Sequence, residues 1–193
     1  DVKSTMKIMQ QLGARLSYEN ELIIVEGCGF KGFKKSVSNL DCGNSGTSAR
    51  LIAGLLAAQN FNSTFIGDES LSKRPMKRVI EPLMKMGTEF QSNKNLTLPL
   101  TIISKSTIHS IKYEMPIASA QVKSSILIAG LHCDEVTTVI ENEQTRDHTE
   151  KMLGLPVRSE NGKILSSSSQ KYYPEAKEYF VPGDISTSAF HIV

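Results

Sequence analysis

The sequence lacks tryptophan, has three cysteines among 193 residues, and carries almost no excess of charge. Its longest apolar run, residues 51–58, is far shorter than the ~18 residues that a membrane-spanning helix needs. The 22 basic and 20 acidic side chains leave a net charge of +2, so the composition indicates no general affinity for nucleic acid or anionic membranes. Any anion-binding site must therefore be built locally.

Cysteine and histidine are too scattered to predict a metal site. Cys28, Cys42 and Cys133 stand far apart, and neither they nor the four histidines show the spacing of metal ligands. An odd number of separated cysteines is typical of reduced thiols in a reducing compartment. The remaining composition, 39% apolar and 22% charged, is that of a globular chain long enough to bury its own core.

What the sequence does contain is an internal repeat. Three helix-like segments each end on an apolar residue followed by glycine, at Gly13, Gly87 and Gly154. A glycine in that place suits the left-handed residue just past a helix end. Strand-like sequence follows each glycine within ~10–15 residues. These strands are predicted over residues 22–25, 96–103 and 163–165.

The second and third units also share an apolar helix and a short strand. Residues 47–58 and 119–131 are apolar or small on nearly every face, which predicts two helices buried on all sides. The predicted strands that follow them cover residues 63–67 and 137–140. By contrast, the helix before Gly87 is apolar on one side only. We therefore expect helices inside and sheets around them.

Two prolines mark the helix before Gly87. Pro75 fits the first helical position, and Pro82 lies inside the pattern, where it should bend or break the helix. The predicted fold class is α/β, with three repeated sheet-and-helix units around buried parallel helices. The first unit is incomplete, because it lacks its opening helix and strand. The chain starts without methionine and stops in mid-pattern, so we expect both ends to be cut and an apolar patch to be exposed in unit one.

Four segments at equivalent places in the units could hold an anion. Residues 41–50 carry two glycines that open onto a buried helix, where free N–H groups and the helix dipole favour an anion. The segment is neither a P-loop nor a dinucleotide fingerprint, because the required Lys or third Gly is missing. The alternative is a plain turn with Thr47 as the helix cap.

The other three segments precede helices as well. Arg74 and Arg146 each stand before a predicted helix start, where the dipole disfavours a cation unless a carboxylate or phosphate is bound. The alternative for each is a solvated arginine. Ser119 could bind a phosphate or simply cap its helix, and Gln121 lies in the first turn, free to bind ring hydroxyls.

The segment around Arg146 also holds acidic and imidazole groups. His148 with Asp147 and Glu150 allows acid–base chemistry, but a surface helix start is the preferred interpretation. Together, the four segments predict a site for a small anionic molecule where helix starts converge.

These segments resemble the 5-enolpyruvylshikimate-3-phosphate (EPSP) synthase family. The resemblance is carried by residues 40–47, 67–76, 119–124 and 145–150, and residues 181–186 resemble the place where that family's chain returns to its other domain. It is collinear over nearly all of the sequence. It implies an N-terminal enolpyruvyl transferase domain over residues 1–182, truncated at its start, with residues 183–193 beginning the return to a second domain.

The resemblance also implies an activity. Members transfer the enolpyruvyl group of phosphoenolpyruvate to the 5-hydroxyl of shikimate 3-phosphate and release phosphate, without a metal or organic cofactor. They act in the cytoplasm, or in the plastid of a plant. By position, the residues matching shikimate 3-phosphate contacts are Ser119, Ala120, Gln121 and Arg146, and those matching phosphoenolpyruvate contacts are Asn44, Gly46 and Arg74.

The family's catalytic groups have no counterpart in this sequence. The lysine is expected upstream of Asp1, and the acid–base carboxylates belong to the second domain, beyond Val193. The 193 residues alone are therefore expected to carry half a cleft and to be inactive. The alternatives are UDP-N-acetylglucosamine enolpyruvyl transferase, whose reactive-loop Cys motif is absent here, and a non-catalytic anion-binding domain of the same fold.

Overall fold

The computed structural model describes residues 2–20, 22–29, 31–105, 107–172, 174 and 178. The boundary predicted between residues 182 and 183, and the segment 181–186 that resembles the crossover, lie outside the described residues. The elements in chain order are α1 (Val2–Gln11), β1 (Arg15–Glu19), β2 (Leu22–Glu26), β3 (Leu40–Asp41), α2 (Gly46–Ala57), β4 (Ser63–Ile66), α3 (Glu69–Ser72), α4 (Lys77–Lys85), β5 (Glu89–Gln91), β6 (Leu100–Ile103), β7 (Lys112–Glu114), α5 (Ala120–Gly130), β8 (Thr137–Glu141), α6 (His148–Leu153), β9 (Val157–Glu160), β10 (Lys163–Ser168) and a 3-10 turn (Gln170–Tyr172).

Two four-stranded sheets follow the same plan, which confirms the repeat. Their strand orders are β3-β4-β6-β5 and β7-β8-β10-β9. In each sheet the first pair is parallel and the other two pairs are antiparallel. The parallel pair is joined through a helix, α2 in one sheet and α5 in the other, as parallel strands require. A separate antiparallel pair, β1-β2, follows α1.

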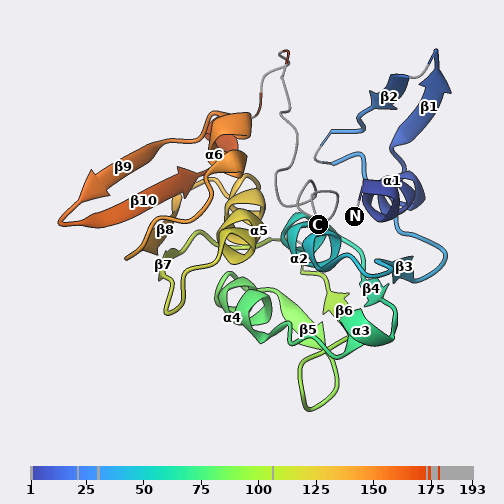
Figure 1. Ribbon diagram of the computed structural model, residues 1–193, viewed down its shortest axis with the longest axis horizontal. Helices are drawn as coiled ribbons and strands as arrows, with labels where there is room; N and C mark the ends of the chain where they lie inside the picture. The colour runs from blue at the N-terminus through green and yellow to red at the C-terminus, as the bar shows by residue number, and fades with distance from the viewer. Residues whose placement is uncertain are drawn as a thin grey trace, which may run out of the picture.

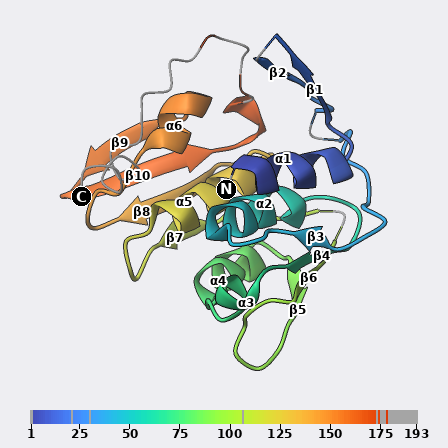
Figure 2. The ribbon, with the colours of Figure 1, turned by 45° about the vertical axis from the view of Figure 1, so that its right-hand side comes forward.

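Helices α2 and α5 lie side by side at the centre, with one four-stranded sheet on either side (Figures 1 and 2). Most of their residues are buried, as predicted from their all-round apolar character. They run in the same direction, because Gln121 contacts Thr47 near both starts and Ser125 meets Gly54 further along. A Cβ on Gly54 would lie 2.1 Å from the Ser125 carbonyl oxygen, so glycine is required for this close approach.

The three predicted glycine stops are confirmed. Gly13, Gly87 and Gly154 have φ values of +102°, +103° and +66°, the left-handed region that glycine adopts without strain. In each case the next residue's N–H returns to a carbonyl in the last turn, for example from Thr88 to Leu83 at 3.1 Å. Helix α4 is also one-sided, as predicted, with Val79 and Ile80 buried.

Two local predictions are wrong, and one of the two outcomes expected at Pro82 is excluded. Helix α4 is not broken at Pro82, since it continues for three more residues. Pro75 is not the first helical residue, since α4 begins at Lys77. Ser45 rather than Thr47 caps α2, and its hydroxyl accepts from the Ser48 N–H at 3.0 Å.

The strand prediction is too long in one place and confirmed elsewhere. Of residues 96–103 only β6 is a strand, because the left-handed Leu96, at φ +53°, turns the chain before it. The apolar patch expected in unit one is present, since the four apolar residues of β2, Leu22, Ile23, Ile24 and Val25, are all exposed. In the described part of the chain, every helix is too short or too polar to cross a membrane.

A candidate anion-binding site at the starts of the buried helices

The first half of the site joins the loop before α2 to the loop after β4. Asp68 caps α3 by accepting from the Leu71 N–H at 2.7 Å, and its own N–H donates to the Gly43 carbonyl at 2.9 Å. The Asn44 amide donates to the Asp68 carboxylate at 2.6 Å. These contacts, first the Leu71 N–H and then the Asn44 amide, lower the pKa of Asp68, so the carboxylate stays charged and fixes Asn44.

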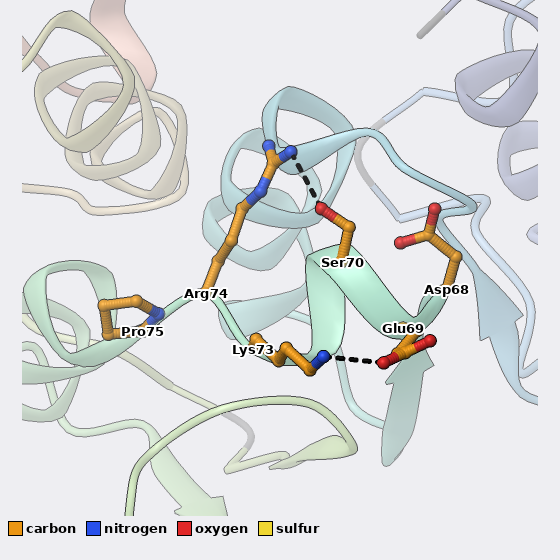
Figure 3. A pocket seen from close by; sticks show the side chains of 6 residues that line it. All are labelled: Asp68, Glu69, Ser70, Lys73, Arg74 and Pro75. Carbon is orange, nitrogen blue, oxygen red and sulfur yellow. Dashed lines mark hydrogen bonds and ion pairs between the residues drawn. The ribbon is translucent and has the colours of Figure 1, made fainter.

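Arg74 is oriented by the same loop. Its Nη2 donates to Asn44 Oδ1 at 3.2 Å and reaches Ser70 Oγ at 3.5 Å. The guanidinium rises above α3 on the far side from Lys73, at the edge of an open pocket of about 690 Å³ (Figure 3). Arg74 therefore lies in the connection between α3 and α4, before the start of α4, as its place in the sequence indicated.

Gly46 leaves room for two guanidinium groups at the start of α2. A Cβ added there would lie 2.5 Å from Arg50 Nη1 and 3.5 Å from Arg74 Nη1. Burial, followed by the nearby charges of Arg74 and Arg78, lowers the pKa of Arg50. Like charges held this close to a helix start create a local positive potential that an anion would relieve.

The second half of the site lies at the start of α5. Ser119, Ala120, Gln121 and Arg146 line one open pocket of about 510 Å³, together with Ala118 and Thr145. Ser119 caps α5, and its hydroxyl accepts from the Val122 N–H at 3.5 Å. Arg146 is exposed at the pocket wall, and no described carboxylate lies within ion-pairing distance of it.

Gln121 joins the two halves and is less free than the sequence indicated. Its Nε2 donates to Thr47 Oγ1 at 3.0 Å, and its Oε1 accepts from Arg50 Nη1 at 3.2 Å. Arg50 Nη1 also donates to the Gly46 carbonyl at 3.2 Å. A continuous set of contacts therefore runs from the Ser119–Arg146 pocket to the loop that holds Arg74.

The acidic and imidazole groups beside Arg146 do not form a cluster. His148 is exposed, whereas Glu150 is only 2% exposed, so the interpretation of this segment as a plain surface helix start is wrong for Glu150. Asp147 pairs with Lys151 at 3.0 Å, and that contact is the main cause of its lowered pKa. This arrangement does not support acid–base chemistry by the three groups acting together.

Lys123 is the polar residue that sequence reasoning missed. It lies inside α5, 1% exposed, with Nζ 2.7 Å from carboxylate oxygens of both Glu141 and Glu150. The available signal was the one charged residue of a helix predicted to be buried on nearly every face, because a buried charge requires a partner.

No group of three metal-ligating side chains occurs within the described ranges. The three cysteines are free thiols, as predicted, and burial raises the pKa of Cys42 to about 12. The thiol of Cys42 is therefore neutral and a poor nucleophile or ligand at neutral pH.

The fold and the site define a repeat-built α/β protein with a positively charged face at the starts of its two buried helices. The family model of EPSP synthase (3-phosphoshikimate 1-carboxyvinyltransferase) matches residues 1–193. The chain belongs to this family.

Individual relatives agree. The 3-phosphoshikimate 1-carboxyvinyltransferases of Vesicomyosocius okutanii and Streptococcus gordonii are 48% and 44% identical to the chain over its whole length. An EPSP synthase structure from Acinetobacter baumannii has a TM-score of 0.78 and 43% identity, over 85% of this chain and 38% of that one. The chain spans 44% and 46% of the length of the first two relatives.

Proposed function

We propose that the chain forms one half of the substrate cleft of an enolpyruvyl transferase that joins phosphoenolpyruvate to shikimate 3-phosphate and releases phosphate. The observation that carries the proposal is the pocket in which Ser119, Gln121 and Arg146 meet, and its link through Arg50 and Gly46 to Arg74. Two adjoining subsites for anions suit a reaction between two phosphorylated substrates.

In this proposal the α5 pocket holds shikimate 3-phosphate. The Arg146 guanidinium would pair with the phosphate, the Ser119 hydroxyl and the adjacent N–H groups of α5 would donate to it, and Ala120 leaves the pocket wall open. The second Nε2 hydrogen of Gln121 would donate to a ring hydroxyl, because the first already bonds Thr47.

The loop before α2 would hold phosphoenolpyruvate. Arg74 can grip a carboxylate or phosphate with two parallel hydrogen bonds, Asn44 fixes its orientation, and Gly46 allows close approach of the ligand to the backbone. Both substrates would then lie on one face, where the 5-hydroxyl oxygen can add to C2 of phosphoenolpyruvate and C3 gains the proton. Loss of a C3 proton and of phosphate from the tetrahedral intermediate completes the transfer.

The finer architecture is part of the proposal. Two complete sheet-and-helix units and the pair β1-β2 support a three-unit, inside-out arrangement, with α2 and α5 as inner helices and α1 as the counterpart of α4 and α6, the helices that end before a glycine. The division at residue 182, with a second domain supplying the proton-transfer groups, agrees with the share of its relatives that the chain spans.

Isothermal titration of the chain with shikimate 3-phosphate tests the substrate assignment, and phosphate release tests the reaction. With both substrates present, phosphate should be released only when the chain is supplemented with the segments that its full-length relatives have and this chain lacks. UDP-N-acetylglucosamine used in place of shikimate 3-phosphate should give no release. Binding of inorganic phosphate and shikimate 3-phosphate with equal affinity, without turnover in the completed protein, would instead indicate a non-catalytic anion-binding domain.

A further inference from the structure

A buried ion cluster is connected to the α5 pocket through Thr145, which lines the pocket and bonds Glu141 of the cluster. Lys123 Nζ contacts Glu141 Oε2 and Glu150 Oε1, each at 2.7 Å, and all three side chains are at most 2% exposed. Ser166 Oγ also donates to Glu150 Oε1 at 2.9 Å. The cluster therefore joins α5 to β8, α6 and β10 where water does not compete for the charges.

One member of the cluster reaches out to the pocket. The second carboxylate oxygen of Glu141 accepts the Thr145 N–H at 3.3 Å and also a short hydrogen bond from the Thr145 hydroxyl. Thr145 and its neighbour Arg146 both line the pocket, on the wall facing Ser119 and Gln121. Glu141 thus fixes the backbone next to Arg146 through the Thr145 N–H. Lys123 in turn pairs with Glu141 and belongs to α5, the helix whose first turn lines the same pocket.

We propose that Lys123, Glu141 and Thr145 are positioning residues that set Arg146 against the start of α5. The proposal rests on the proposed function, because it assigns the preorganised arginine to the phosphate of shikimate 3-phosphate. Burial keeps Lys123 and Glu141 from touching a ligand in the pocket, whereas Thr145 is half-buried and lies at the pocket wall. They act through the guanidinium, since fixing the backbone at residue 145 limits the positions available to the next side chain.

The variant that tests this is Thr145→Val, which removes the hydroxyl and leaves Lys123, Glu141 and Glu150 in place. Thr138→Val is the matched control, because Thr138 on β8 also makes a buried hydroxyl contact, 3.2 Å from Ser167, away from the pocket. In isothermal titrations, Thr145→Val should weaken shikimate 3-phosphate binding by about five- to tenfold, and Thr138→Val should not change it.

A double-mutant cycle separates positioning from a general structural effect. If Thr145 acts through Arg146, then Thr145→Val added to Arg146→Ala should cause no further loss of affinity. The same five- to tenfold loss in both backgrounds would overturn the proposal, as would unchanged affinity in Thr145→Val alone.

Amide hydrogen exchange provides a readout that does not depend on any ligand. The N–H of residue 145 should exchange slowly in the wild-type chain and about tenfold faster in Thr145→Val, with no change at that position in Thr138→Val. An unchanged exchange rate would overturn the positioning role. A third outcome is faster exchange in Thr145→Val together with no binding of shikimate 3-phosphate by the wild type. That outcome would support the positioning role of Thr145 and contradict only the proposed function.

Discussion

Arg50 on α2 donates a hydrogen bond from Nη1 to Oε1 of Gln121 on α5, at 3.2 Å. The two residues are 71 positions apart in the sequence and meet only because the two buried helices lie side by side with their starts together. The bond couples the loop that orients Arg74 to the pocket that holds Arg146. The two proposed substrates would therefore be placed relative to each other by the packing of α2 on α5.

Replacing Arg146 with alanine should weaken the binding of shikimate 3-phosphate. Loss of a charge-assisted contact costs ~1.5–3 kcal/mol, or roughly ten- to a hundredfold in affinity. Isothermal titration measures the change directly. The exposed neighbour His148 provides the control, because His148→Ala should leave the affinity unchanged. Equal affinity in Arg146→Ala and the wild type would remove Arg146 from the site.

Arg74→Lys should reduce affinity for phosphoenolpyruvate by about tenfold although the charge is kept. A lysine lacks the planar fork that holds a carboxylate or phosphate with two hydrogen bonds while another N–H engages Asn44. The measurement is the KM for phosphoenolpyruvate in the completed protein. Lys73→Ala serves as the control, since Lys73 lines the same pocket but pairs with Glu69 at 2.6 Å. A larger effect of Lys73→Ala than of Arg74→Lys would contradict the assignment.

The two buried helices and their glycine-marked neighbours could be predicted because apolar periodicity and left-handed glycines are local signals. The N-cap of α2 could not be predicted from the sequence, because Ser45, Thr47 and Ser48 all have a hydroxyl that can cap a helix. Only the backbone geometry determines which of them is the cap.

The candidate site likewise has residues that could be predicted from local sequence and residues that could not. Arg74 and Arg146 were found from their places before helices. The contacts of Gln121 and the burial of Lys123 depend on which elements pack together, and that information is spread over segments far apart in the chain.

Lys123→Met should destabilise the chain severely. It leaves Glu141 and Glu150 buried without their cation, an uncompensated charge that costs ~3–5 kcal/mol. Urea unfolding measures the loss. Adding Glu141→Gln and Glu150→Gln to Lys123→Met should recover most of it, because no buried charge then remains. If the triple variant is less stable than Lys123→Met, the charge explanation fails.

A surface ion pair of similar length gives the matched control for Lys123→Met. Lys73 and Glu69 are 2.6 Å apart, but their side chains are 72% and 87% exposed. Lys73→Met should therefore change the free energy of unfolding by less than ~1 kcal/mol. Comparable losses in Lys73→Met and Lys123→Met would show that burial is not what makes the Lys123 cluster important.

His132 should make the stability of the chain depend on pH below neutrality. Burial lowers the pKa of His132 from its ordinary value of 6.5 to about 4 in the folded state. Between these two values the unfolded chain binds the extra proton, so the contribution of His132 to stability is complete above pH 6.5 and is lost as the pH falls toward 4. The slope contributed by one such group is at most about 1.4 kcal/mol per pH unit. Urea unfolding at a series of pH values should show this slope in the wild type and in His148→Gln, whose histidine is exposed, and a shallower one in His132→Gln. An identical pH dependence in His132→Gln and the wild type would show that His132 takes up its proton as readily in the folded chain as in the unfolded one.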